Sequence, residues 1–267
     1  LGRKHIDEIT SDDVIRLMHK GIQDGAAPAT VNRWIVILRY MYNLVIHRWK
    51  LPGVEVDPTA GIGLLKENNC VERYVTEEEM ARLYEAVTAS ASPMLKYIVA
   101  FLILTGARRG EVLHATWADI DLARGDWRIS KTKAGEARHI PLNEGAIKVL
   151  EAVRGLSRSE YIFGNPKTGK PYVHIWQAWN TARKKAGLED VRMHDLRHTF
   201  ASLLINNGRS LYEVQKLLGH TQIQTTQRYA HLARTTLIEA SNLGTTAIMP
   251  CLGLAAGDGP IIQGRAV

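Results

Sequence analysis

The chain has 267 residues, of which 45% are hydrophobic and 23% charged, and its formal net charge is +7 at pH 7. This composition is that of a soluble globular protein with one large or two modest domains, and it excludes a disordered or fibrous chain. The apolar runs are too short for a membrane-spanning helix, the N-terminus lacks an export signal, and two cysteines, Cys70 and Cys251, predict neither a disulfide framework nor a zinc site. We therefore expect a cytoplasmic protein that does not bind membranes, and the basic excess favours a nucleic-acid partner.

The first 65 residues predict a small helical module. Ser11, followed by two aspartates, is suited to cap a first helix, which we expect to end at Gly21 and Gly25. Thr30 opens a longer helix whose apolar residues recur on one face as far as Val45. The other face carries three candidate DNA-phosphate contacts: Arg33, Arg39 and Arg48. Residues 66–73 are polar and aperiodic and predict a linker.

Residues 74–242 predict a second domain that is mainly α with a small antiparallel β-sheet, an α+β fold. Thr76 and Glu79 form a capping-box pattern before the first of three helices, at 80–87, 93–105 and 109–118. Alternating segments at 127–130 and 138–141 predict a hairpin, extended by 119–121 to a three-stranded sheet. Helical patterns resume at 144–153, 173–185, 194–206, 211–218 and 225–232. Residues 243–267 carry little charge and several glycines, which predicts an irregular tail.

Several polar residues suit the cleavage of a phosphodiester without a metal ion. That reaction needs a nucleophile, fixed positive groups for the non-bridging oxygens, and groups that accept and donate protons. Arginine suits the second task because its planar fork matches phosphate oxygens and stays charged. The candidates are Arg108 and Arg109 after a helix stop, His194 and Arg197 on one helix face, His220 at a helix end, and Tyr229.

Each of these signals, taken alone, is also typical of an ordinary surface or core. Arginines after a helix are common on solvated surfaces, and a single tyrosine such as Tyr229 is common in a core. The i, i+4 spacing of His194 and His198 would suit a zinc pair, but the glutamate of zinc proteases is missing, so we expect no metal. The sequence has no phosphate-binding P-loop and no nucleophile elbow.

Together, four blocks in their order and spacing closely resemble the tyrosine recombinases, the phage integrase family. The resemblance covers about residues 75–232 and, more weakly, the helical module before them. The blocks are Thr105-Gly106-Ala107-Arg108 with Glu111, a hairpin lysine, His194-Asp195-Leu196-Arg197-His198, and Leu218-Gly219-His220 followed nine residues later by Tyr229.

The resemblance implies a role for each matching residue. Two residues match the phosphate-clamping arginines, Arg108 and Arg197, and two more, Glu111 and Asp195, match residues that position the clamp. The other matches are the histidine that assists proton transfer (His194), the histidine that contacts the scissile phosphate (His220) and the nucleophile (Tyr229). Both Lys131 and Lys133 lie in the hairpin, and Lys133, eight residues before Pro141, fits the family's catalytic lysine better. Arg109 is expected to be a neighbour without a catalytic role.

The resemblance also implies the reaction and its partners. Tyr229 would form a 3′-phosphotyrosyl link to double-stranded DNA without metal, ATP or another cofactor, and four protomers would exchange strands through a Holliday junction, with accessory DNA-bending proteins as further partners. Residues 1–65 resemble the family's core-binding (SAM-like) domain and residues 74–242 its catalytic domain. We expect the enzyme at nucleoid DNA of a bacterial cytoplasm. Because the chain starts at Leu1 inside that module, we expect it to lack a first helix and to be part of a longer protein.

Two other functions stay open at this point. A type IB topoisomerase-like protein would use the same clamp and tyrosine but rejoin the same strand. A non-catalytic DNA-binding regulator would keep the fold without the chemistry. The separate helical module favours recombination over the first, and the complete set of matching residues argues against the second.

Overall fold

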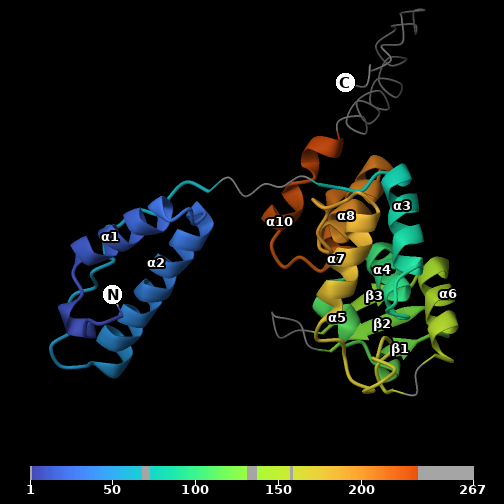
Figure 1. Cartoon of the computed structure of the whole chain (residues 1–267), viewed down its shortest axis with the longest axis horizontal. Coiled ribbons are helices and arrows are strands. Elements are labelled where there is room, and N and C mark those ends of the chain that lie inside the picture. Colours follow the sequence, from blue (N-terminus) through green and yellow to red (C-terminus); the bar gives the residue numbers. More distant parts are fainter. Residues whose placement is uncertain (1, 68–72, 131–136, 157–158, 234–267) are drawn as a thin grey trace, which may run out of the picture. The chain divides into compact units, whose positions relative to one another are not determined.

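The computed structural model describes residues 2–67, 73–130, 137–156 and 159–233. The chain divides into two compact units, Leu1–Val71 and Glu72–Val267 (Figure 1). The first is helical, and the second is mainly helical with one small sheet. The fold class expected from the sequence is therefore confirmed.

The first unit is built on two helices, α1 (Ser11–Gln23) and α2 (Pro28–Asn43), with a 3-10 turn η1 (Ile6–Glu8) before them and a π-helical segment η2 (Leu44–Trp49) after them. Its main core cluster consists of Val14, Met18, Val31 and Ile35. The side-chain amide of Asn32 bonds the backbone of Leu65 in both directions, which ties the end of the module to α2.

Three sequence expectations for this unit are wrong in detail. Thr10, not Ser11, caps α1, through a reciprocal pair of hydrogen bonds with Asp13. Gly21 does not end α1 but lies within it. A Cβ at this position would lie 2.6 Å from the ring of Trp34, so the close packing of α2 against α1 favours glycine here. Helix α2 begins at Pro28, whose ring suits the first turn of a helix.

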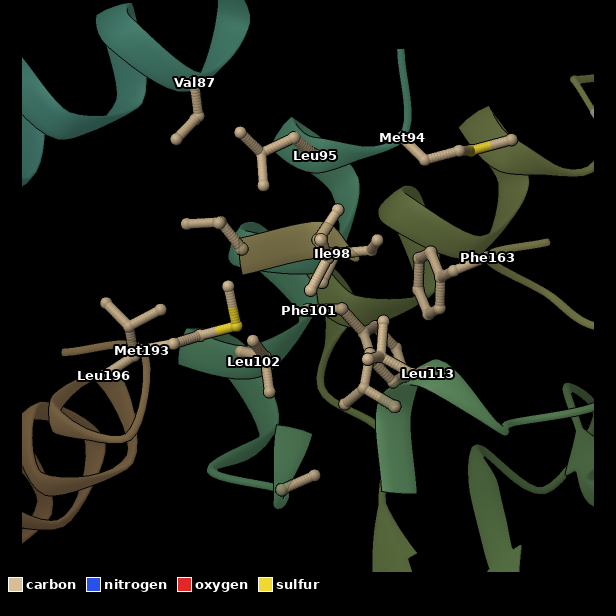
Figure 2. Packing of buried hydrophobic residues seen from close by; sticks show 14 of the residues in the cluster. Val87, Met94, Leu95, Ile98, Phe101, Leu102, Leu113, Phe163, Met193 and Leu196 are labelled. Atoms are coloured by element: carbon tan, nitrogen blue, oxygen red, sulfur yellow. The ribbon is translucent and has the colours of Figure 1, made fainter. Parts of the chain in front are cut away.

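The second unit is organised around α4 (Leu95–Thr105). This helix packs against α3 (Glu77–Thr88), α6 (Glu144–Val153), α7 (Ile175–Lys185) and α8 (Asp195–Asn206). Figure 2 shows Ile98, Phe101 and Leu102 of α4 among side chains of neighbouring segments. The rings of Phe101 and Phe163 lie 5.2 Å apart. Almost every residue of α4 is apolar, so the helix is stable only where other elements cover nearly all of its faces.

The sheet has the order β1 (Ile120–Asp121), β2 (Asp126–Ile129) and β3 (Arg138–Pro141), all antiparallel, as expected from the sequence. Trp127 of β2 pairs with Ile140 of β3, and both are buried in the main core. Residues 131–136, which connect β2 to β3, lie outside the described residues.

Two predicted helices are shorter than expected. Helix α5 covers only Arg109–Leu113, because the chain then extends to pair with another segment: Ala115 accepts a hydrogen bond from Ile162, and Thr116 forms a β-bridge with Tyr161. A 3-10 turn, η3 (Trp117–Asp119), follows. After α9 (Leu211–Leu218), the expected helix 225–232 is divided into α10 (Gln224–Gln227) and a 3-10 turn, η4 (Ala230–Ala233). Tyr229 lies between them.

Candidate active site

The sharp turn after α4 places Arg108 beside α8. Gly106 ends α4 in the left-handed conformation, at φ 61°. A Cβ on Gly106 would lie 2.3 Å from the ring of Phe200 in α8, so only glycine allows the two segments to approach this closely. Arg108 is then the N-cap residue of α5.

Glu111 holds Arg108 from the first turn of α5. Its carboxylate accepts the backbone N–H of Arg108 at 2.8 Å and pairs with Nη1 of the same residue at 3.0 Å. Burial raises the pKa of Glu111, but Arg138 and the hydrogen bonds from Arg108 outweigh burial, so its pKa lies below the ordinary value. The Arg108 side chain stays 40% exposed and accessible to a ligand.

Arg197 extends from α8 to the turn that carries Arg108, and its side chain is buried. Its Nη1 donates to the carbonyl of Gly106 and its Nη2 to the carbonyl of Leu218, both at 2.7 Å. Burial lowers the pKa of Arg197 to about 9, with repulsion from Arg108 and Arg138 acting in the same direction. A buried arginine among other arginines, with one carboxylate nearby, is suited to bind an anion.

Asp195 acts on the start of α8 and not directly on the clamp. It is fully buried, and it accepts the backbone N–H of Arg192 at 2.7 Å and the guanidinium of Arg192 at the same distance. Among the described residues, neither Arg108 nor Arg197 has an ion pair with it. The structure therefore places Asp195 as the anchor of the helix that carries His194 and Arg197.

Tyr229 is buried, with 5% of its surface exposed, and its hydroxyl shares a hydrogen bond with Nδ1 of His198 at 2.5 Å. The His198 ring in turn meets the ring of His194 edge-on, with centroids 4.9 Å apart. Burial lowers the pKa of His198 to about 4 and raises the pKa of Tyr229. His198 is therefore neutral near pH 7 and can accept the hydroxyl hydrogen.

His220 follows the left-handed Gly219 that ends α9. Its Nδ1 contacts Oγ1 of Thr226 at 2.8 Å, which fixes the ring. Burial, together with repulsion from the three nearby arginines, Arg197, Arg108 and Arg138, lowers the pKa of His220 to about 3. A neutral imidazole beside arginines is able to donate one N–H to a phosphate oxygen without adding charge.

The structure thus brings together five of the expected catalytic residues: Arg108, His194, Arg197, His220 and Tyr229. A cleft of about 1150 Å³ is lined by Arg108, Glu111 and His194, together with residues of α5 and β2. Lys131 and Lys133 lie outside the described residues.

The sequence patterns assign no catalytic role to two residues of this cluster. His198 stands in a family block and at a spacing from His194 that would suit zinc, but neither pattern predicts its contact with Tyr229. Arg138, the first residue of β3, forms a second ion pair with Glu111 at 2.6 Å. The alternating pattern of β3 gave no signal for it, because its partners lie far away in the sequence.

The three candidate DNA contacts of the first unit differ in their surroundings. Arg33 and Arg48 are exposed on α2 and η2. Arg39 is half-buried, and its guanidinium donates to the backbone carbonyls of Thr59 and Ile62. The structure therefore gives Arg39 a role inside the module, where it holds the 59–62 segment against α2.

No group of three or more histidine, cysteine, aspartate or glutamate side chains in the described ranges has the arrangement of a metal site. None of the described helices combines the length and the apolar character needed to span a membrane.

Comparison with known proteins matches residues 73–236 to the phage integrase family. The chain is 30% identical over 239 residues to the tyrosine recombinase XerC of Roseiflexus castenholzii, which covers 84% of this chain and 75% of that protein. It is 29% identical over 228 residues to the integrase of Salmonella phage P22, covering 80% of this chain and 57% of that protein.

Solved structures with the same fold include the XerA recombinase, with a TM-score of 0.53, 26% identity, and coverage of 90% of this chain and 85% of that one. A lambda integrase dimer bound to a COC′ core site has a TM-score of 0.68 at 20% identity, covering 84% of this chain and 80% of that one.

Fold and comparisons define an enzyme of the class that transfers DNA strands through a tyrosine. The chain belongs to the phage integrase family, and its function is site-specific DNA recombination. The resemblance stated from the sequence blocks is confirmed, and neither a topoisomerase-like protein nor a non-catalytic regulator is favoured.

Proposed function

We propose that this chain cuts and rejoins double-stranded DNA through a 3′-phosphotyrosyl intermediate, with Tyr229 as the nucleophile. The observation that carries the proposal is the convergence of a tyrosine hydroxyl, two arginines and three histidines from separate parts of the second unit: Tyr229, Arg108, Arg197, His194, His198 and His220. Such a set meets the requirements of phosphoryl transfer without a metal ion.

In the proposed reaction, Arg108 and Arg197 bind the non-bridging oxygens of the scissile phosphate, where negative charge grows as the tyrosine oxygen attacks. Neutral His220 donates a further hydrogen bond to the same phosphate. Fixed donors of this kind stabilise the transition state because they are already in place before charge develops.

Protons have to leave the nucleophile and reach the leaving group. The Tyr229 hydroxyl shares a hydrogen bond with Nδ1 of His198, and in the tautomer that carries its proton on Nε2, His198 accepts the hydroxyl proton. His194, which contacts the His198 ring, assists the transfer of that proton. The oxygen–phosphorus bond to Tyr229 forms while the bond to the 5′-oxygen breaks, and Lys133 donates a proton to that oxygen. The 5′-hydroxyl of a second duplex then attacks the phosphotyrosine and releases Tyr229. The covalent intermediate conserves the phosphodiester bond energy, so no ATP is needed.

The two units have different proposed tasks. Residues 1–65 form a core-binding module, in which Arg33 and Arg48 contact DNA phosphates, and residues 74–242 form the catalytic domain. Phosphate contacts supply affinity but little sequence information. The net charge of +7 supports a DNA partner.

We propose that four protomers assemble on two DNA sites and exchange strands in pairs. Lambda integrase, a structural neighbour at 21% identity, has been solved as a tetramer bound to a Holliday junction, which supports this assembly. Accessory DNA-bending proteins that bring the two sites together, and a location at the DNA of a bacterial cytoplasm, complete the proposal.

A covalent capture experiment tests the nucleophile. Duplexes with a random core and a nick near it are incubated with the protein, so that the short fragment leaves and the adduct is trapped. The native protein should capture a defined subset of sequences and join the captured strand to a labelled acceptor duplex. The variant Tyr229→Phe should fold and bind DNA but capture none.

The control variant Tyr212→Phe changes an exposed tyrosine of α9 and should capture DNA as the native protein does. An adduct formed by Tyr229→Phe would contradict the assignment of the nucleophile. A trapped adduct that rejoins the released fragment when this is added back, but never joins the acceptor duplex, would contradict recombination.

A further inference from the structure

Three arginines converge on the last turn of α9, just before His220. The consecutive carbonyls of Leu217, Leu218 and Gly219 each accept a hydrogen bond from a different arginine. The donors are Arg138 at 3.2 Å, Arg197 at 2.7 Å and Arg108 at 3.3 Å, respectively. The carboxyl end of a helix carries unpaired carbonyls and partial negative charge, so it is a natural anchor for guanidinium groups.

Arg138 is much more buried than Arg108, and among the described residues it differs from Arg197 in having a carboxylate partner. Only 12% of its side chain is exposed, compared with 40% for Arg108. Its Nη2 pairs with Oε2 of Glu111 at 2.6 Å, the same oxygen that accepts the backbone N–H of Arg108. Arg138 therefore shares the carboxylate that holds Arg108.

We infer that Arg138 is a positioning residue for DNA cleavage, which keeps Glu111 from neutralising Arg108. This inference rests on the proposed function, in which Arg108 binds the scissile phosphate. In the structure, Glu111 gives Oε1 to the Arg108 side chain and Oε2 to Arg138. Without Arg138, Oε2 keeps only the backbone N–H of Arg108. The whole carboxylate charge then acts on Arg108, so less of the Arg108 charge and fewer of its N–H groups face the phosphate.

Gly219 leaves the room that the Arg138 side chain occupies. The guanidinium of this side chain lies against Gly219, where a Cβ would be 2.3 Å from Nη1 of Arg138. Gly219 also has a φ of 64°, which favours glycine. One planar group thus bridges Glu111 and Leu217 across the backbone of Gly219. The single ammonium of a lysine would keep the ion pair but lose the bond to Leu217.

The charge balance gives a specific prediction. If Arg138 acts by competing for Glu111, its loss matters only while residue 111 carries a negative charge. In Arg138→Met, single-turnover cleavage of a nicked substrate at saturating protein should slow by about 10- to 100-fold, less than for loss of a direct phosphate donor. The dissociation constant for DNA should change by less than about threefold, because Arg138 does not touch DNA.

The decisive variant is the double substitution Glu111→Gln with Arg138→Met. Glutamine keeps the shape of Glu111 without its charge, so the double variant should cleave faster than Arg138→Met alone. Arg138→Lys should lie between Arg138→Met and the native protein, and it keeps the test valid if Arg138→Met does not fold. Arg124→Met, which removes an exposed arginine paired with Asp121 near the same sheet, should cleave at the native rate.

Cleavage by Arg138→Met at the native rate would overturn the inference, as would a double variant slowed by the product of the two single effects. A dissociation constant that rises in proportion to the loss of rate would also overturn it, because Arg138 would then be a DNA contact. These results leave the proposed function standing as long as the native protein forms its adduct at Tyr229. Absence of that adduct would instead be a failure of the proposed function.

Discussion

Replacing Arg197 with lysine keeps a positive charge in the clamp but removes its planar fork. Arg197 donates to two carbonyls, those of Gly106 and Leu218, and a lysine ammonium cannot reach both in the same geometry. Loss of one buried, charged hydrogen bond should lower the free energy of unfolding by about 1.5–3 kcal/mol. Loss of a fixed donor at the phosphate should slow cleavage by about 100- to 1,000-fold.

The environment of Arg197 adds a dependence on pH. Burial and the neighbouring arginines lower the pKa of Arg197 to about 9, so it stays charged at pH 6–8. The same surroundings would lower the pKa of a lysine from its ordinary value of about 10.4. A lysine with a lowered pKa gains its proton as the pH falls from 8 to 6. The cleavage rate of the variant relative to the native protein should therefore rise over that range.

The assay is single-turnover cleavage of the captured DNA site at pH 6, 7 and 8, with urea unfolding of each protein. The matched control is Arg109→Lys, which changes the exposed neighbour of Arg108 and should cleave within about twofold of the native rate. A rate for Arg197→Lys equal to the native rate would refute the assignment of Arg197 to the clamp. A rate ratio independent of pH would refute the argument from its surroundings.

Three further expectations concern proton-bearing groups. His198→Leu leaves the buried Tyr229 hydroxyl without its hydrogen-bond partner and should lower the free energy of unfolding by about 1–3 kcal/mol in urea titrations. A free energy of unfolding equal to that of the native protein would contradict this expectation. Burial lowers the pKa values of His198 and His220 to about 4 and about 3, so below pH 6.5 the unfolded chain binds more protons than the folded one. The free energy of unfolding should therefore fall by about 1–2 kcal/mol from pH 7 to pH 5, and an unchanged midpoint of urea unfolding would contradict this. A substrate with sulfur in the 5′-bridging position, whose leaving group needs no proton, should restore cleavage by Lys133→Ala; rescue of Lys131→Ala instead would make Lys131 the acid.

The sequence was sufficient to predict the fold class and the family because the decisive signals are local. Glycine stops such as Gly106 and Gly219 end helices through their own backbone conformation, and the residues that follow them are Arg108 and His220. The order of the blocks then implied a single site, and the structure brings these residues together.

The remaining features depend on contacts that no local pattern encodes. The alternating pattern predicts only that Arg138 lies in a strand, whereas its partners Glu111 and Leu217 are 27 and 79 residues away in the sequence. The sequence pattern predicts that Gly21 ends a helix, but Gly21 lies inside α1, where a side chain would collide with the ring of Trp34. The predicted helix at 225–232 is interrupted at Tyr229, whose side chain turns into the small core cluster beneath α8 and α9.

The most direct test of the account is to identify the covalent bond itself. The trapped protein–DNA adduct is digested with protease and nuclease, and the peptide that carries the nucleotide is sequenced by mass spectrometry. The account predicts one modified peptide, with a 3′-phosphate joined to the oxygen of Tyr229 and a free 5′-hydroxyl on the released strand. A nucleotide on any other residue, or a 5′-phosphate linkage, would contradict it.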